Sequence, residues 1–415
     1  ASDVYKRQVW TPTSDGVVFT SNDPKSKVEK KRVKDGYDAI YVFEGPNGQG
    51  RSSWSNIWKV GLSDKKCQQV TKEEIRVSGL DVSPDGQRVA LVYRRENARN
   101  RQNLAEIGIA RLDDGKLVRL TENKAPESRI RWKPNSRELG YLAPSDTSWE
   151  LRQDRLYVMD VEIKEHRLVS GPFEGDISNF VWSADGKRAL IEAGAKTNRL
   201  IFDLDGSNGS SREILSNPGV ARYVSFSSDG KKAAFVWSDA LHAPDVYSID
   251  LSPGAKPKQL TDLNPEFRDK VMARFEVVTW KSKDGLPIEG LLFLPPDRKS
   301  DERVPLILQV HGGPAGVFTN SWNTGYHILA GLGYAVLCPN VRGSSAYGDD
   351  LLRGNMKDIG GGDYQDLMTG VDKLIEDGLV DPERMGIRGW SYGGILGGWT
   401  ITQTNRCLLY TSPSP

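Results

Sequence analysis

A pattern of two apolar anchors separated by a polar turn recurs five times in the first two-thirds of the chain. The first copy reads Trp10-Thr-Pro-Thr-Ser-Asp-Gly-Val-Val-Phe19, and the second anchor always lies nine positions after the first. The turns are rich in Pro, Asp and Gly, residues that fold a chain back between antiparallel strands. The pattern therefore predicts five β-hairpins. The other four copies span residues 82–91, 132–141, 182–191 and 226–235.

Each hairpin is followed by an alternating apolar segment, a polar turn and a short closing segment. The first anchors lie 72, 50, 50 and 44 positions apart, which is the size of a four-stranded propeller blade with variable loops. The longest interval carries a charged insertion near residues 25–38. We therefore predict that residues 9–271 form a partial β-propeller with about five visible blades. A set of unrelated hairpins is the alternative, which the shared anchor register and closing strand disfavour.

From residue 272 onwards the chain alternates short strands with helical stretches. A hairpin is predicted at residues 275–294, followed by apolar strands at 304–310, 335–338 and 385–388. Helical stretches lie between them, near residues 323–330 and 364–376. Strand–helix alternation of this kind favours a doubly wound, largely parallel sheet, in which ligands bind at the carboxyl ends of the strands.

The strongest catalytic motif is Gly389-Trp390-Ser391-Tyr392-Gly393, which follows the last of these strands. A strand–turn–helix setting is what a nucleophile elbow requires, because small flanking residues allow the sharp turn that exposes the serine hydroxyl. The alternative is an incidental serine in a glycine-rich turn. We predict that Ser391 is a catalytic nucleophile and that residues 272–406 form the N-terminal half of an α/β-hydrolase domain.

A second motif, His311-Gly312-Gly313-Pro314, ends the strand at 304–310. Its glycines let the backbone approach a substrate oxygen and donate an N–H to an oxyanion, with the N–H of Tyr392 as the partner donor. A plain tight turn is the alternative. His311 precedes the serine, whereas the triad of this fold runs Ser, then Asp or Glu, then His. We therefore interpret His311 as a residue that orients the loop.

A third motif, Asn340-Val-Arg342-Gly343-Ser344, follows the strand at 335–338. Arg342 can pair with an acidic group of the domain or line the substrate channel, and the structural role is favoured because a buried arginine near such a site is usually paired. Asp363 and Asp366 are expected to favour the positive end of the next helix rather than to form an acid/base pair.

Charge and composition exclude several other classes. The net charge is +1, so no global field favours nucleic acid, and the basic stretches at 25–34 and 94–101 fit loops of the blades. No apolar run approaches the ~20 residues that span a bilayer, so no membrane partner is expected. Three cysteines and four histidines show neither disulfide nor metal-ligand spacing. We therefore predict no metal and no cofactor.

A propeller joined to a domain with HGGP, NxRGS and GWSYGG resembles the prolyl oligopeptidase family of serine peptidases. The run Gly362-Asp-Tyr-Gln-Asp-Leu-Met368 is similar to the sequence usual at this place in the acylaminoacyl-peptidase and dipeptidyl-peptidase-like branch. The resemblance covers residues 10–406 and implies seven blades and hydrolysis of short peptides through an acyl-enzyme on Ser391. It also implies an oxyanion hole made by the backbone N–H groups of Gly313 and Tyr392.

The chain departs from the family pattern after the serine, since none of the 24 residues that follow Ser391 is Asp or His. We therefore expect an incomplete and inactive copy with non-native ends at 1–8 and 407–415. Its sheet is expected to have an unpaired edge. The alternatives are a non-catalytic propeller that binds peptides or a partner, and an esterase. A cytoplasmic location, a periplasmic or secreted one, and a homo-oligomer all stay open.

Overall fold

The N-terminal part of the chain consists of five consecutive groups of four strands. The computed structural model describes residues 7–37, 53–122, 125–144, 151–171, 173, 175–215, 217–406 and 409–411. The first two groups are β1 (Gln8–Trp10), β2 (Gly16–Asn22), β3 (Ser55–Gly61) and β4 (Cys67–Gln69), then β5 (Arg76–Val82), β6 (Arg88–Arg94), β7 (Glu106–Arg111) and β8 (Leu117–Arg119). The third and fourth are β9 (Ser128–Trp132), β10 (Glu138–Pro144), β11 (Asp154–Asp160) and β12 (His166–Leu168), then β13 (Asp176–Trp182), β14 (Arg188–Ala195), β15 (Asn198–Asp205) and β16 (Ser211–Glu213). The fifth is β17 (Val220–Phe226), β18 (Lys232–Ser238), β19 (Asp245–Asp250) and β20 (Lys258–Gln259).

Within each group the strands pair antiparallel in chain order, so all five predicted hairpins are present. The turn between the first two strands is stabilised by the same hydrogen bonds in several repeats. In three repeats a serine hydroxyl donates to the aspartate two residues later, and the same hydroxyl accepts the N–H that starts the second strand. The polar Ser-x-Asp-Gly turn thus satisfies its own backbone, which is why it could be recognised in the sequence.

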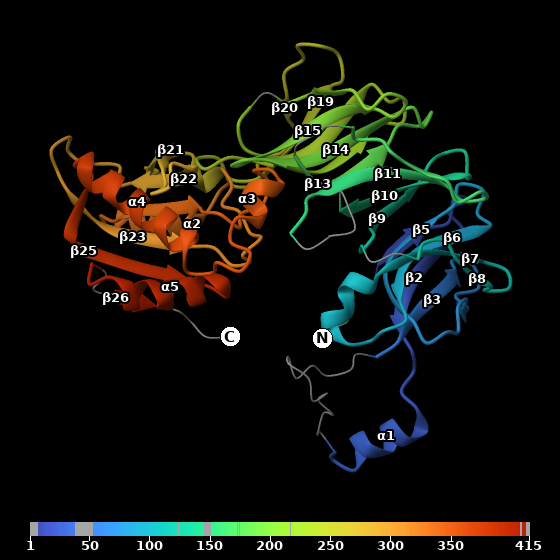
Figure 1. Ribbon diagram of the computed structural model, residues 1–415. Coiled ribbons are helices and arrows are strands. Elements are labelled where there is room, and N and C mark those ends of the chain that lie inside the picture. The colour runs from blue at the N-terminus through green and yellow to red at the C-terminus, as the bar shows by residue number, and fades with distance from the viewer. Residues whose placement is uncertain are drawn as a thin grey trace.

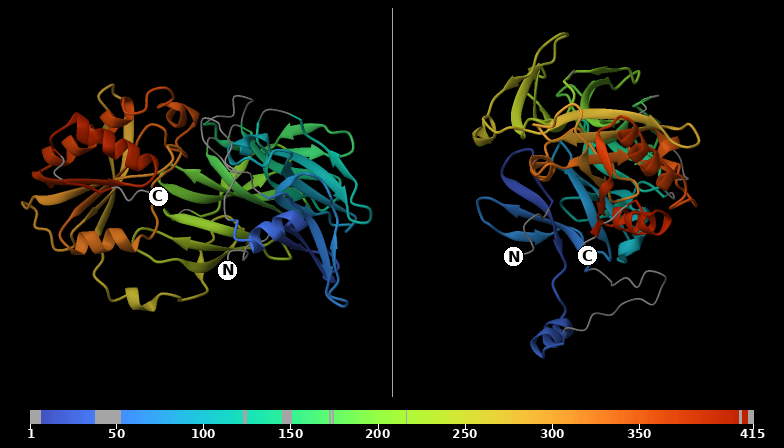
Figure 2. Two further views of the ribbon diagram at one scale, coloured as in Figure 1. Left: turned by 90° about the horizontal axis from the view of Figure 1, so that it is seen from below. Right: turned by 90° about the vertical axis from the view of Figure 1, so that its left-hand side faces the viewer.

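The five sheets pack face to face in chain order (Figures 1 and 2). Each apolar cluster joins two neighbouring repeats; Val18 and Ile57 of the first repeat, for example, pack with Leu80 and Leu91 of the second. A single parallel bridge from Ser55 to Arg76 links the first and second repeats, and another from Arg199 to Val220 links the fourth and fifth. In the described part of the chain the sheets form no closed ring. The predicted propeller is therefore supported in its repeats but is not confirmed as a closed structure.

The C-terminal part is one mixed sheet with the order β21-β22-β24-β23-β25-β26. Its strands are β21 (Arg274–Lys281), β22 (Pro287–Leu294), β23 (Val304–Val310), β24 (Ala335–Asn340), β25 (Val380–Gly389) and β26 (Leu409–Thr411). Its helices are α2 (Thr324–Gly331), α3 (Asp349–Arg353), α4 (Gly362–Glu376) and α5 (Tyr392–Gln403). The first two strands form the predicted antiparallel hairpin, and β24, β23, β25 and β26 are parallel, as the strand–helix alternation indicated.

Helices cover both faces of this sheet. Leu306 and Leu308 of β23 pack with Leu367 of α4 and Leu396 of α5, whereas Ile307 points to the other face, towards Ala330 of α2. β26 pairs with β25 and is the last strand of the sheet in the described residues, so the expected unpaired edge lies at β26 rather than at β25. Four other elements were missed: α1 (Lys27–Lys34) in the charged insertion, the short helix α3, and the 3-10 helices η1 (Arg99–Leu104) and η2 (Pro265–Phe267). No helix in the described ranges is long and apolar enough to cross a membrane.

The loops at the carboxyl edge of the sheet dock on repeats three to five (Figure 1). After β23, Asn320 donates from its N–H to the Thr197 carbonyl at 2.6 Å, and its side chain accepts from the Ala240 N–H. After β24, the Ala346 carbonyl accepts from the Lys196 N–H at 2.8 Å, and Asp349 pairs with Arg152 at 3.1 Å. The edge that carries the candidate catalytic motifs therefore faces the repeats.

Candidate active site

Ser391 lies at the turn between β25 and α5. Its backbone has φ 55° and ψ −121°, a conformation that L-residues other than glycine rarely adopt. A strained serine held between a strand and a helix is the geometry of a nucleophile elbow. The first turn of α5 is tied to this residue, because the Gly394 and Ile395 N–H groups donate to the Ser391 carbonyl.

The two glycines of the motif are required by close backbone contacts. A Cβ on Gly393 would lie 2.3 Å from the Val310 carbonyl oxygen, and one on Gly389 would lie 2.3 Å from the Gly393 carbonyl oxygen. Gly312 in turn lies against the serine, since its Cβ would be 3.5 Å from the Ser391 Cβ. The elbow and the loop after β23 therefore form one packed unit.

The two predicted oxyanion donors lie on the two halves of this unit. Gly313 has φ 141°, where glycine is favoured, and it follows Gly312, which contacts the serine. Tyr392 is the first residue of α5. Within the described residues neither of these backbone N–H groups donates to a protein acceptor. Two unsatisfied donors beside a serine can bind an oxyanion.

His311 is buried and holds the loop from both ring nitrogens. Its Nδ1 lies 2.9 Å from the Gly312 carbonyl oxygen and its Nε2 lies 2.9 Å from the Ser344 Oγ. Burial lowers the pKa of the imidazole, with the Gly312 contact acting in the opposite direction. Both nitrogens are thus occupied away from Ser391, a geometry that agrees with the interpretation of His311 as a loop-orienting residue.

Arg342 pairs with Asp366 of α4, which is 0% exposed. The Arg342 backbone N–H, Nε and Nη2 donate to this carboxylate at 2.8, 3.0 and 2.8 Å, and Nη1 donates to Asp284 at 3.0 Å. The hydrogen bonds that Arg342 donates to Asp366 are the main reason that the pKa of Arg342 is raised. The expectation that Asp366 serves the end of the helix was wrong, because it is the buried partner of Arg342.

Asp363 is also buried, and its side chain contacts Tyr392, the residue that follows Ser391. It accepts hydrogen bonds from the Gly360 and Tyr364 N–H groups at 2.8 Å and from the hydroxyl of Tyr392. Asn355 donates to the same hydroxyl at 3.3 Å. Asp363 does lie in the first turn of α4, as expected, but its side chain also fixes Tyr392. The sequence offered no signal for this contact, because the two residues are far apart in the chain.

Replacing Asp363 with Asn should change how stability depends on pH. Burial raises the pKa of the Asp363 carboxyl above its usual 3.8, although its hydrogen bonds act in the opposite direction. The folded state therefore keeps this proton to higher pH than the unfolded state, and the free energy of unfolding falls as the pH rises from about 4. Thermal melts between pH 4 and 7 should show a smaller decrease for Asp363→Asn than for the parent.

The exposed Asp350 of α3 gives the matched control, and Asp350→Asn should follow the parent curve. The other titrating groups contribute equally to the pH dependence of parent and variant, so their contribution cancels in the difference between the two. A difference between the Asp363→Asn and parent midpoints that stays constant with pH would contradict this account.

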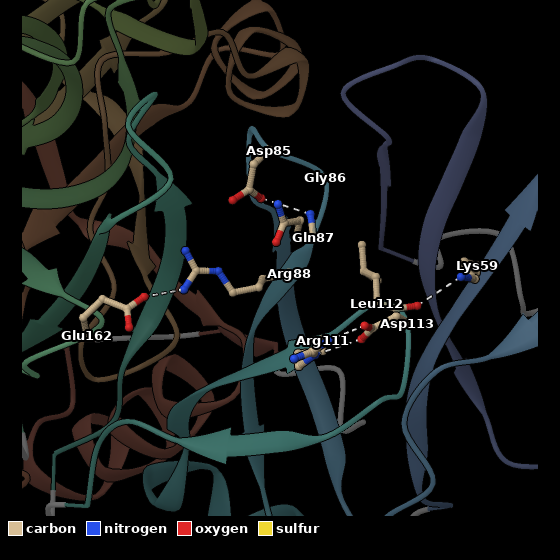
Figure 3. Close-up of a pocket in the computed structure, with 9 residues that line it drawn as sticks. All are labelled: Lys59, Asp85, Gly86, Gln87, Arg88, Arg111, Leu112, Asp113 and Glu162. Atoms are coloured by element: carbon tan, nitrogen blue, oxygen red, sulfur yellow. Dashed lines mark hydrogen bonds and ion pairs between the residues drawn. The ribbon is translucent and has the colours of Figure 1, made fainter.

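A cavity of about 700 Å³ lies among the repeats and is lined by none of these residues (Figure 3). It is lined by charged side chains, among them the Arg88–Glu162 ion pair at 2.8 Å. The turns that line it lie at the strand ends opposite to the loops that contact the α/β part.

Among the described residues no group of three or more His, Cys, Asp or Glu is arranged to hold a metal ion.

The elbow, the glycine loop and the mixed sheet with helices on both faces define a protein of the α/β-hydrolase type. A model of the prolyl oligopeptidase family matches residues 320–409, which include the elbow. The resemblance predicted from the motifs is therefore confirmed as a match to the prolyl oligopeptidase family over these residues.

Two curated relatives and one solved structure extend the match. The chain is 38% identical over 164 residues to the uncharacterized peptidase YuxL of Bacillus subtilis, covering 39% of this chain and 25% of the relative. It is 25% identical to dipeptidyl-peptidase 5 of Porphyromonas gingivalis, covering 76% and 47%. The acylaminoacyl peptidase of Pyrococcus horikoshii has the same fold, with a TM-score of 0.78, 18% identity and coverage of 98% and 62%. The chain thus spans less than half the length of these two curated relatives.

Proposed function

We propose that this chain is part of a serine peptidase that hydrolyses short peptides, with Ser391 as the nucleophile. The Ser391 Oγ attacks the peptide carbonyl, the backbone N–H groups of Gly313 and Tyr392 bind the resulting oxyanion, and the acyl-enzyme is then hydrolysed by water. Gly312, Gly389 and Gly393 give the backbone the room that this geometry needs. His311, Trp390 and Arg342 support the site without touching the reacting atoms.

The observation that carries the proposal is the backbone strain at Ser391, because strain of this kind is retained where function needs it. An incidental serine in a glycine-rich turn has no reason to combine φ 55° with ψ −121° next to two unsatisfied N–H groups. The names of the relatives support a peptidase over an esterase, and they suggest acylaminoacyl- or dipeptidyl-peptidase action. We further propose that the five repeats form part of a propeller that limits access to the serine.

A fluorophosphonate probe tests the nucleophile directly. The Ser391 Oγ attacks phosphorus, fluoride leaves, and the hydroxyl proton passes to a base. In the described part of the chain no imidazole hydrogen-bonds to Ser391, so we expect slow labelling of this chain. Added imidazole should accelerate it, although by less than the about 10²–10⁴-fold of a positioned base. Intact mass spectrometry measures the rate.

Ser391→Ala should abolish the labelling, and Ser345→Ala, in the neighbouring loop, should leave it unchanged. Labelling that persists in Ser391→Ala would exclude Ser391 as the nucleophile. A chain that stays unlabelled at high imidazole would favour the non-catalytic binding protein instead. Fast labelling without imidazole would show that the chain is not inactive by itself.

A further inference from the structure

A group of arginines lies on the repeats at the ends of the strands that face the α/β part. Arg199 is the second residue of β15, directly after the turn that contacts Asn320 and Ala346. The parallel bridge between Arg199 and Val220 places Arg222 of β17 nearby, and the charges of Arg222 and Arg129 both act on Arg199. Three guanidinium groups from three repeats therefore share one electrostatic environment.

Irregular strand pairing occurs at Arg129 and directly after Arg222, each on the first strand of its repeat. The first strand of repeats two to five carries a shift of register against the second strand. In the third repeat the extra residue begins at Arg129, with φ 51°, and in the fifth at Tyr223, with φ 58°, directly after Arg222. Bulges re-aim side chains and are frequent next to active sites, and positive φ at a bulky residue is strain kept for a purpose.

None of the three arginines forms an ion pair with any acid in the described ranges. Among the described residues the Arg199 side chain donates only to the hydroxyl of Ser178, and its Nε is buried without a partner. Arg129 and Arg222 are exposed, and neither guanidinium group hydrogen-bonds to another residue of the described ranges. This leaves guanidinium donors free for a ligand.

The acids nearby do not neutralise the group. Glu192 is buried and already accepts hydrogen bonds from the Asn179 side chain and the Val224 N–H. Asp154 is half-buried beside Asp176, and desolvation together with that neighbouring charge raises its pKa to about 7. Arg7, Arg131 and Arg155 add further positive charge around Arg129. Several arginines thus gather at this end of the repeats, although the whole chain has a net charge of only +1.

We propose that Arg129, Arg199 and Arg222 form a receiving site for a carboxylate of the bound peptide. The site rests on the proposed function, since it orients a peptide whose carbonyl is presented to Ser391. The guanidinium groups match a carboxylate in charge and geometry. The exposed ring of Tyr223, 74% accessible, adds an apolar surface for the adjoining residue of the peptide. Both a C-terminal carboxylate and an acidic side chain have the required chemistry.

Ligand-observed NMR with the chain tests this site without any turnover. Three probes are compared: acetyl-trialanine with a free carboxylate, the same peptide as its C-terminal amide, and an amidated acetyl peptide with one glutamate. We expect at least one acidic probe to bind about tenfold more tightly than the neutral amide. The preference should shrink in high salt. Preference for the free acid alone identifies the C-terminal carboxylate, and preference for the glutamate peptide alone identifies a side chain.

Arg129→Gln and Arg222→Gln should each remove most of this preference. Because the two residues lie at different β-bulges, a loss in both variants cannot come from the distortion of a single bulge. Arg111→Gln is the control, because Arg111 is exposed on β7, next to the charged cavity, and pairs with Asp113. Equal binding of neutral and acidic probes, no binding of either acidic probe, or an unchanged preference in both variants would overturn the proposal. Ser391→Ala should keep the preference, so a failure of the nucleophile and a failure of this site are observed separately.

Discussion

Replacing Arg342 with Met is expected to destabilise the α/β part by about 3–5 kcal/mol, because it leaves a buried carboxylate without its counterion. Asp366 is fully buried, and Arg342 supplies two side-chain donors to it besides a backbone N–H. Amide hydrogen exchange in α4 measures the effect, since it reports the opening of this part of the chain alone.

Arg384 provides the matched control, because it pairs with Asp381 near the start of β25 but is largely exposed. Arg384→Met should cost less than about 1 kcal/mol. The double variant Arg342→Met/Asp366→Leu should recover part of the loss, because the buried charge is removed together with its partner. Equal losses in Arg342→Met and Arg384→Met would show that the buried pair contributes no more than a surface pair.

The elements were predictable from the sequence where local chemistry and periodicity agreed. The Ser-x-Asp-Gly turns satisfy their own backbone, and the strand β23 alternates buried Leu306 and Leu308 with Ile307 on the other face. Helix α1 was missed because its charged residues carry no apolar periodicity. The pairing of β26 with β25 was missed because the expectation of non-native residues at that end of the chain set the segment aside.

The candidate site was predictable in its motifs but not in its long-range contacts. The position of the two motifs directly after predicted strands placed them on one edge of the sheet, the family resemblance pointed to Gly313 and Tyr392, and the structure brings the two loops into contact. The buried roles of Asp363 and Asp366 were not predictable, because a carboxylate early in a helix is usually solvated and favours the helix dipole. Likewise, no local pattern distinguishes Arg129 or Arg222 from surface arginines; only the register shifts of their strands do.

Replacing Gly393 with Ala is expected to disrupt the elbow, because its Cβ would meet the Val310 carbonyl oxygen at 2.3 Å and the His311 carbonyl oxygen at 2.8 Å. Both obstacles are backbone atoms at the end of β23, which cannot rotate away as a side chain can. Helix α5 must therefore move, and the Ser391 backbone that precedes it must move as well. We expect a loss of about 3 kcal/mol in stability and the loss of imidazole-dependent labelling at Ser391.

Gly331 is the control for this change, because it ends α2 and a Cβ there meets no atom within 4 Å. Gly331→Ala should label like the parent and be slightly more stable, since Ala favours a helix over Gly. If Gly393→Ala labelled normally, the fit of α5 against β23 could not be what positions the serine. If Gly393→Ala were as stable as the parent but unlabelled, Gly393 would be needed to position Ser391 and not to maintain the fold. For the mechanism, this result would be more informative than normal labelling.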